Sequence, residues 1–199
     1  MTVPDPLPPP NALAAPTPAL PGARGGVLAP ARLLRGAALV PAVAYLLVAL
    51  SPPLNHDVAA VLNFAERMLA GERLYADLID VNPPLIFVLN LLPAALGAWT
   101  PLDAVQGLLL CLFGLCALST WLTLRLGRPG APPVEAACLS AAVPLLTLAA
   151  GYEFGQREHL MTVAAFPYLM LAARRMEGQA TGPLASFGAA MLAALGFAL

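Results

Sequence analysis

Residues 51–84 read SPPLNHDVAAVLNFAERMLAGERLYADLIDVNPP and form a polar, acid-rich segment between long apolar runs. Ionisable groups held beside a bilayer usually mark the place where a membrane protein performs chemistry or transport. The acidic residues of this segment are Asp57, Glu66, Glu72, Asp77 and Asp80.

The composition of the whole chain favours a membrane protein. Of its 199 residues, 59% are hydrophobic and only 11% are charged, whereas soluble domains carry about 25% charged residues. So few charges cannot cover the surface of a soluble protein, and we expect an all-α integral membrane protein. The net charge of -1 argues against a nucleic-acid partner.

Proline dominates the start of the chain. Residues 1–30 contain nine of the 22 prolines, a density that blocks helices and sheets and predicts a disordered cytoplasmic tail. Arginines follow, and then an apolar run that we interpret as a first span at about 33–51. A signal peptide is the alternative, because a basic flank before a short apolar core is typical of one.

The charges of the loops indicate which apolar runs cross the membrane, because Lys and Arg favour the cytoplasmic side. If the run 83–99 crossed, Arg125 and Arg128 would lie outside. If it does not cross, seven of the ten arginines lie inside and eight of the eleven acids lie outside. We therefore predict a membrane domain over 31–199, a polytopic bundle with one long outer loop over 52–102. The predicted spans lie at about 33–51, 103–126, 134–151, 160–174 and 183–199.

The outer loop is expected to carry two juxtamembrane helices. Apolar residues recur at helical spacing in its first half, which predicts an amphipathic helix lying on the membrane surface with its apolar side down. Gly71 is placed to end this helix, and Asn82-Pro83-Pro84 begins the next, since Pro in a first helical turn costs no hydrogen bond. The apolar stripe consists of Val58, Val61, Leu62, Ala65, Met68 and Leu69.

Two polar clusters face the same side under this topology. The first combines Asp57 with the later residues 77–82, and the second is the segment 152–159, YEFGQREH. A carboxylate can take a proton from a hydroxyl, two or three carboxylates can hold Mg²⁺ or Mn²⁺, and an arginine can clamp a phosphate. Those are the requirements of sugar transfer from a polyprenyl-phosphate donor whose tail lies in the bilayer.

Particular residues follow from this chemistry, each with a structural alternative. Asp57 is a candidate base or a helix N-cap, and Glu153 and Arg157 are either site residues or a salt bridge four residues apart. The candidate catalytic residues are Asp57 and Glu158. The candidate metal ligands for Mg²⁺ or Mn²⁺ are Asp57 and Glu153. The candidate substrate-binding residues are Arg73, Asp80, Asn82, Gln156, Arg157 and His159.

The order of a span, an acid, GERLYADLIDVNPPLI and later FGQREHL resembles the GT-C membrane glycosyltransferases. The most similar members in kind are polyprenyl-phosphate-sugar transferases, including protein O-mannosyltransferases and aminoarabinose transferases. The resemblance implies a catalytic acid after the first span at Asp57, a turn at 82–84 and a second outer-loop acid at Glu153 or Glu158. Asn82 stands where the family usually has lysine, so the phosphate contact must come from elsewhere, such as Arg157 or Arg73.

The resemblance covers about residues 33–199, the N-terminal half of such an enzyme. It implies an inverting transferase on the periplasmic face of a bacterial inner membrane, with membrane lipid around it and the N-terminus in the cytoplasm. Because the run 183–199 ends without an interfacial anchor, we expect the chain to be part of a longer protein. A transporter or flippase is the rival class, and an inactive fragment is the third interpretation.

Overall fold

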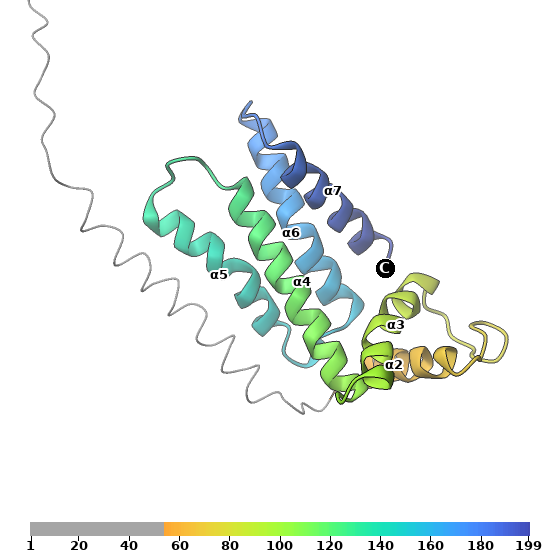
Figure 1. Cartoon of the computed structure of the whole chain (residues 1–199). Helices are drawn as coiled ribbons and strands as arrows, with labels where there is room; N and C mark the ends of the chain where they lie inside the picture. The colour runs from red at the N-terminus through yellow and green to blue at the C-terminus, as the bar shows by residue number, and fades with distance from the viewer. Residues whose placement is uncertain (1–53) are drawn as a thin grey trace, which may run out of the picture.

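The computed structural model describes residues 54–199, and within this range the chain is all-helical, with only an isolated bridge between Leu74 and Leu78 (Figure 1). The predicted tail at 1–30 and the predicted first span at 33–51 lie outside the described residues. The elements are α2 (His56–Leu69), α3 (Pro84–Trp99), α4 (Ala104–Leu126), α5 (Pro133–Ala149), the 3₁₀ turn η1 (Gly151–Glu153), α6 (Arg157–Met176) and α7 (Pro183–Phe197).

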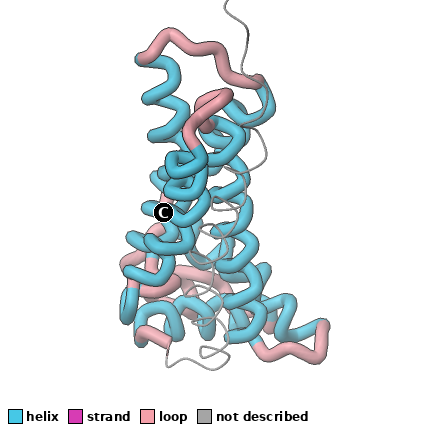
Figure 2. The backbone as a smooth tube through the Cα atoms, turned by 90° about the vertical axis from the view of Figure 1, so that its left-hand side faces the viewer, coloured by secondary structure: helices cyan, strands magenta, loops and turns pink. Residues whose placement is uncertain are grey.

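Four long helices form a bundle, and the two remaining helices lie at one end of it. α4 contacts α5, α6 and α7, and at its beginning it also packs on α3. α2 packs on α3, and Figure 1 shows this pair at the lower end, with their long connecting turn projecting sideways. In the view turned by 90°, the bundle is long and narrow with its loops gathered at the two ends (Figure 2).

The helices of the bundle occur where the apolar runs predict them. α4 begins with a capping box in which the Asp103 carboxylate accepts from the Gln106 N–H and the Gln106 side chain bonds back to the Asp103 backbone. α5 and α7 each begin with a proline in the first turn, a position where no hydrogen bond is lost. The four helices correspond to the predicted spans at 103–126, 134–151, 160–174 and 183–199.

Length and apolar composition distinguish α4 from its neighbours. Among the described helices, α4 alone is both long and apolar enough to cross a membrane. α3, α5 and α7 are apolar but shorter. An all-α fold is confirmed for the described residues, whereas the membrane crossings themselves stay a prediction.

The bundle is held together by close approaches at small residues. A Cβ placed on Gly196 of α7 would lie 2.9 Å from the Cβ of Ala164 in α6. One on Gly107 of α4 would lie 2.5 Å from the Pro93 carbonyl oxygen in α3. Small residues let helix backbones approach in this way, which is common where helices pack inside a bilayer. The contact at Gly107 fixes α3 against the beginning of α4.

The apolar stripe of α2 is turned toward protein. Val58, Leu62 and Ala65 are buried against α3 and α4, and Val61 packs with Ile86 and Phe87 of α3. Leu69 is 40% exposed and does not belong to the buried stripe. The predicted helix and its end near Gly71 (φ 104°) are confirmed, but the stripe packs on helices where a bilayer was expected, because α3 lies directly over it.

Candidate functional site

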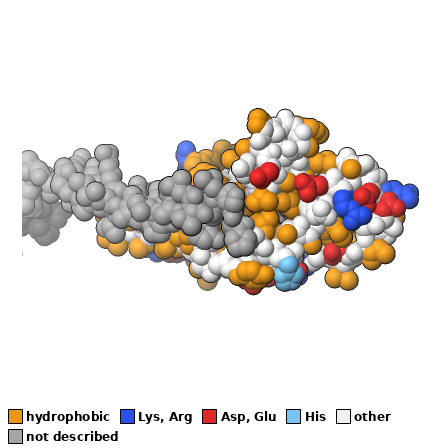
Figure 3. Space-filling view, turned by 90° about the horizontal axis from the view of Figure 1, so that it is seen from below, with side chains coloured by type: hydrophobic (Ala, Val, Ile, Leu, Met, Phe, Trp, Pro, Cys, Tyr) orange, Lys and Arg blue, Asp and Glu red, His pale blue; other side chains and the backbone are white. Residues whose placement is uncertain are grey.

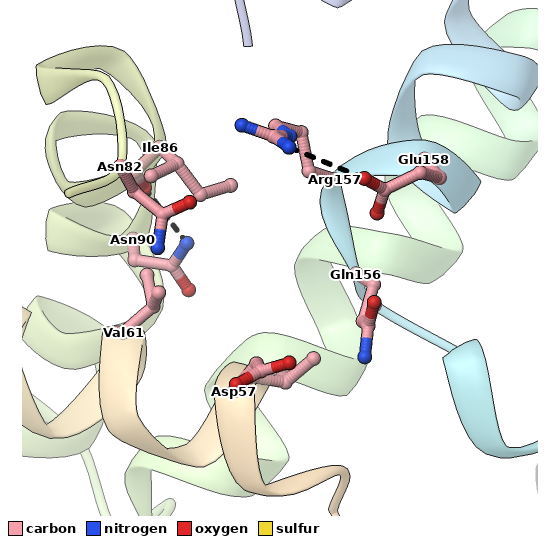
Figure 4. Close-up of a pocket in the computed structure, with 10 residues that line it drawn as sticks. Asp57, Val61, Asn82, Ile86, Asn90, Gln156, Arg157 and Glu158 are labelled. Carbon is pink, nitrogen blue, oxygen red and sulfur yellow. Dashed lines mark hydrogen bonds and ion pairs between the residues drawn. The ribbon is translucent and has the colours of Figure 1, made fainter.

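A cavity of about 280 Å³ lies where α2, α3 and the beginning of α6 meet (Figure 4). It brings together the two polar clusters that are about a hundred residues apart in the chain. We call it the polar cavity. Its lining residues are Asp57, Val58, Val61, Asn82, Ile86, Asn90, Gly155, Gln156, Arg157 and Glu158.

The turn before α6 is tied to the beginning of α2, and this tie creates the cavity. The Asn55 amide donates to the Tyr152 carbonyl (3.3 Å), and the His56 ring lies 3.3 Å from the Tyr152 hydroxyl. Gly155 adopts a positive φ of 85° and lies against Val58, where an added Cβ would come within 3.3 Å of a valine methyl. A residue with a side chain would be strained there.

Asp57 presents a carboxylate to the polar cavity. The N-cap of α2 is Asn55, whose side-chain oxygen accepts from the Asp57 N–H at 2.9 Å. The capping alternative for Asp57 is therefore wrong, because the helix begins at His56, two residues earlier than that role requires. The carboxylate is 64% exposed and lies 3.3 Å from the ring of His56. It is held at the end of a helix and remains accessible to a ligand.

Arg157 and Glu158 form the opposite wall with Gln156, and Figure 4 shows the Arg157 guanidinium reaching across the open side toward α3. Arg157 pairs with Glu158 at 3.3 Å. The predicted pair of Glu153 with Arg157 does not form, because that spacing requires one continuous helix. Here η1 ends at Glu153, Gly155 turns the chain, and α6 begins at Arg157.

The turn between α2 and α3 supplies Asn82 alone to the polar cavity. Asp80 accepts from both the backbone and the side chain of Asn82, at 2.8 and 2.9 Å, so it holds the turn and does not line the cavity. Arg73 is also absent from the lining, and it bonds to the Asp77 carboxylate instead. Asp80 and Arg73, both predicted to bind substrate, thus lie outside the lining and stabilise the turn.

His159 is buried beneath the turn and does not line the polar cavity. Its Nδ1 accepts from the Gly155 N–H at 3.1 Å, and its ring packs on Phe154. Burial lowers the pKa of His159 from 6.5 to about 4, since desolvation penalises the charged imidazolium. Its predicted role in substrate binding is not seen, because its free nitrogen is shut away from the cavity.

The expected pair of metal ligands does not assemble. Asp57 lines the polar cavity, whereas Glu153 lies outside its lining. Within residues 54–199, no group of three His, Cys, Asp or Glu side chains is placed to hold a metal ion. Mg²⁺ and Mn²⁺ favour several oxygen ligands, and of the two predicted ligands only Asp57 lines the cavity.

A second cavity of about 210 Å³ adjoins the first and is almost wholly apolar. We call it the apolar cavity. Asn90 lines both cavities and is not among the predicted site residues. The only signal for it was an amide in the middle of an apolar run. The other lining residues are Leu89, Leu92, Pro93, Leu108, Cys111, Leu112, Leu115, Leu160, Ala164, Leu192, Leu195, Gly196 and Leu199.

The end of the molecule that carries the polar cavity is also rich in charge. Viewed from this end, carboxylates, guanidinium groups and an imidazole lie among hydrophobic side chains (Figure 3). The lining of the polar cavity itself contains two carboxylates, one guanidinium and three carboxamides. Such a set can bind a phosphate, hydrogen-bond to hydroxyls and accept a proton.

Comparison with known proteins identifies no family. No protein-family model matches the chain, and neither the curated proteins nor the solved structures provide a match. The resemblance to GT-C glycosyltransferases thus rests on the residues quoted from the sequence.

Proposed function

We propose that the chain is a polytopic membrane protein whose long helices cross the bilayer. The outward-facing side chains of the bundle support this, because large hydrophobic residues are exposed on each of its helices. Examples are Phe113 of α4 (51%), Leu145 of α5 (50%), Leu169 of α6 (62%) and Phe187 of α7 (66%). A bilayer would cover these side chains. The polar cavity would then lie at the outer end.

We further propose that the polar cavity transfers a sugar from a polyprenyl-phosphate donor to a hydroxyl acceptor. The observation that carries this proposal is the meeting of Asp57 with Arg157 and Glu158 in one cavity beside an apolar one. Sugar transfer at a membrane surface requires a polar environment for the reacting groups and an apolar one for a lipid chain. The outer face of a bacterial inner membrane is the corresponding location.

The transfer needs three tasks from these residues. Asp57 takes the proton from the acceptor hydroxyl as its oxygen forms a bond to the anomeric carbon of the sugar. The bond between that carbon and the phosphate oxygen breaks, and its electron pair leaves with the polyprenyl phosphate. Arg157 stabilises the charge on the departing phosphate, and Glu158 orients the guanidinium from 3.3 Å. Asn82 and Gln156 are placed to hydrogen-bond the sugar.

A transporter of lipids or polar metabolites is the second candidate. It is favoured by the prolines inside three helices, Pro93, Pro144 and Pro167, since transporters place their sites on interrupted helices. The charged residues weigh against it. Asp57, Arg157 and Glu158 all lie in the first turn of a helix, whereas transporters bind near the middle of the bilayer.

Turnover of a lipid-linked sugar tests the enzyme proposal. The Asp57→Asn variant should lose roughly 10²- to 10⁴-fold in the release of undecaprenyl phosphate from undecaprenyl-phosphate hexoses, because a general base contributes about that much. Asp77→Asn is the matched control, since Asp77 bonds to Arg73 outside the cavity. Unchanged turnover in Asp57→Asn would remove Asp57 from the mechanism. Lipid movement across vesicles without any sugar release would favour the transporter.

A further inference from the structure

The side-chain amide of Asn90 is buried, and only one of its two polar atoms has a hydrogen-bond partner within residues 54–199. Its side chain is on α3, the residue is 7% exposed, and its nitrogen donates to the Ile86 carbonyl at 2.8 Å. Because a carbonyl can only accept, this bond fixes which end of the amide faces away from the helix. The free atom is therefore the oxygen, which has no hydrogen-bond partner within the described part of the chain.

The position of this oxygen is as informative as its lack of a partner. Asn90 lines both cavities, so it marks the boundary between polar and apolar surroundings. In Figure 4 its oxygen points away from Ile86, and almost none of its surface is accessible to solvent. A molecule that filled both cavities would pass Asn90 at the junction between its polar head and its hydrocarbon chain.

Hydrogen-bond chemistry restricts what can stand at that junction. A buried acceptor without a donor is unfavourable, and binding relieves this only if the ligand brings an O–H or N–H group. An ionised phosphodiester, an ester or an ether offers only acceptors and would leave the oxygen unpaired. Sites built in this way reject analogues that lack the matching group. The phosphate of the donor is thus better placed at Arg157 than at Asn90.

We propose that Asn90 determines specificity for an acceptor lipid, accepting a hydrogen bond from a hydroxyl or amide N–H where its head group joins its chain. The chain occupies the apolar cavity, and the head group extends into the polar cavity toward Asp57. This assignment rests on the proposed glycosyl transfer, since it names the acceptor that Asp57 deprotonates. Asn90 is a positioning residue and takes no part in the bond changes.

Binding of two matched lipids to the detergent-solubilised full chain, measured by native mass spectrometry, tests the proposal. The probes are dodecane-1,2-diol and its dimethyl ether, which differ in their hydrogen-bond donors. The wild-type protein should bind the diol about tenfold more tightly, the effect of one buried hydrogen bond. Equal binding of the two probes, or binding of neither, would overturn the proposal, because membrane lipid chains or another protein segment would then fill the apolar cavity.

Two variants test whether Asn90 is the residue responsible for the preference for the diol over the ether. Asn90→Leu should bind diol and ether alike, since it keeps the volume and removes the acceptor. Val88→Leu is the control on the same helix, because Val88 is 50% exposed and lines neither cavity, and it should keep the tenfold preference. A preference that survives Asn90→Leu would assign the recognition to another group. The comparison of probes in the wild type holds even if Asn90→Leu does not fold.

A parallel measurement separates this proposal from the proposed function. Undecaprenyl phosphate should bind the wild type and bind Arg157→Ala at least tenfold more weakly, because a charge-assisted contact is lost. If the wild type prefers the diol but does not bind undecaprenyl phosphate, the glycosyl-transfer proposal fails and the lipid site remains. If it binds undecaprenyl phosphate without preferring the diol, the role of Asn90 fails alone.

Discussion

The two ends of the helical bundle differ in how far their polar side chains are paired with one another. At the end distant from the polar cavity, Arg128 pairs with Glu177, and Gln179 donates to Glu177 at 3.1 Å. Arg174 also donates to Gln179. These contacts join the turn after α4 to the turn after α6, although Arg174 Nε is buried without a partner in the described range.

At the cavity end, polar side chains are held in place but remain available. Asn55 takes the capping role and leaves the Asp57 carboxylate exposed beside His56, and the buried oxygen of Asn90 has no partner in the described range. Arg157 keeps a neighbour in Glu158, with its side chain 42% exposed. The contrast indicates that the paired end serves stability, whereas the cavity end is arranged for a ligand.

Among the substitutions that compare the two ends, replacement of Arg157 should have the largest effect on activity. Arg157→Ala should lower sugar transfer roughly 10²- to 10³-fold, the effect of removing one group that stabilises charge in a transition state. Arg157→Lys should recover only part of the activity, because lysine keeps the charge but not the planar fork that matches a phosphate. Turnover of undecaprenyl-phosphate hexoses measures both variants. Full activity in Arg157→Ala would place the phosphate elsewhere.

The buried His159 should make the cavity end sensitive to acid. Its pKa of about 4 in the folded state lies below 6.5, so the unfolded chain binds the proton more readily. Its contribution to stability is therefore complete above pH 6.5 and is lost as the pH falls toward 4. The free energy of unfolding should decrease by up to about 2 kcal/mol between pH 6.5 and 4.5.

Thermal unfolding in detergent across this pH range measures the effect. His159→Gln should show a flatter profile than the wild type, since glutamine does not titrate. His56→Gln leaves His159 in place and should keep the loss of stability that His159 causes. If the wild type and His159→Gln lost stability in parallel as the pH fell, His159 would not be the group responsible.

The sequence predicts the helices well and the site only partly. The apolar runs were enough to locate α4, α5, α6 and α7, because hydrophobicity along the chain is a local signal. The arginine and acid count brought the two polar clusters to the same side, and the polar cavity joins members of both. This agreement follows from the positions of the charged residues along the chain, which contain no information about contacts between side chains.

The remaining errors arise from geometry that no local pattern contains. The turn at Gly155 directs Arg157 and Glu158 into the cavity and leaves Glu153 outside, although all three are similarly polar in the sequence. His159 follows directly and is buried. The α2 stripe would look the same against lipid or protein, and Asn90 is informative only once both cavities are known.

Two glycines with positive φ permit a matched test of the two ends. Gly155 (φ 85°) meets Val58 at 3.3 Å if a Cβ is added, whereas Gly130 (φ 76°), in the turn after α4, has nothing within 4 Å. Alanine should cost about 1–2 kcal/mol of stability at either position, because left-handed backbone is unfavourable for it. Gly155→Ala should also reduce sugar transfer, whereas Gly130→Ala should not.

Both glycine variants are measured for thermal unfolding and for turnover. Thermal unfolding reports the backbone strain, and turnover reports any displacement of the cavity wall. Gly155→Ala shifts the turn that carries Gln156 and Arg157, so its loss of activity should exceed what its loss of stability explains. Equal turnover in the two variants at matched stability would mean that the exact placement of this turn does not matter to the site.

The smallest effect is expected at the paired end, from Arg128→Ala. Arg128 and Glu177 are about half and one-third exposed, and double-mutant cycles on exposed pairs give roughly 0.2–1 kcal/mol. The double variant Arg128→Ala/Glu177→Ala should therefore be nearly as stable as either single variant, and all three should transfer sugar at the wild-type rate. A large loss of turnover in these variants would show that the far end takes part in function, and the division between the two ends would no longer hold.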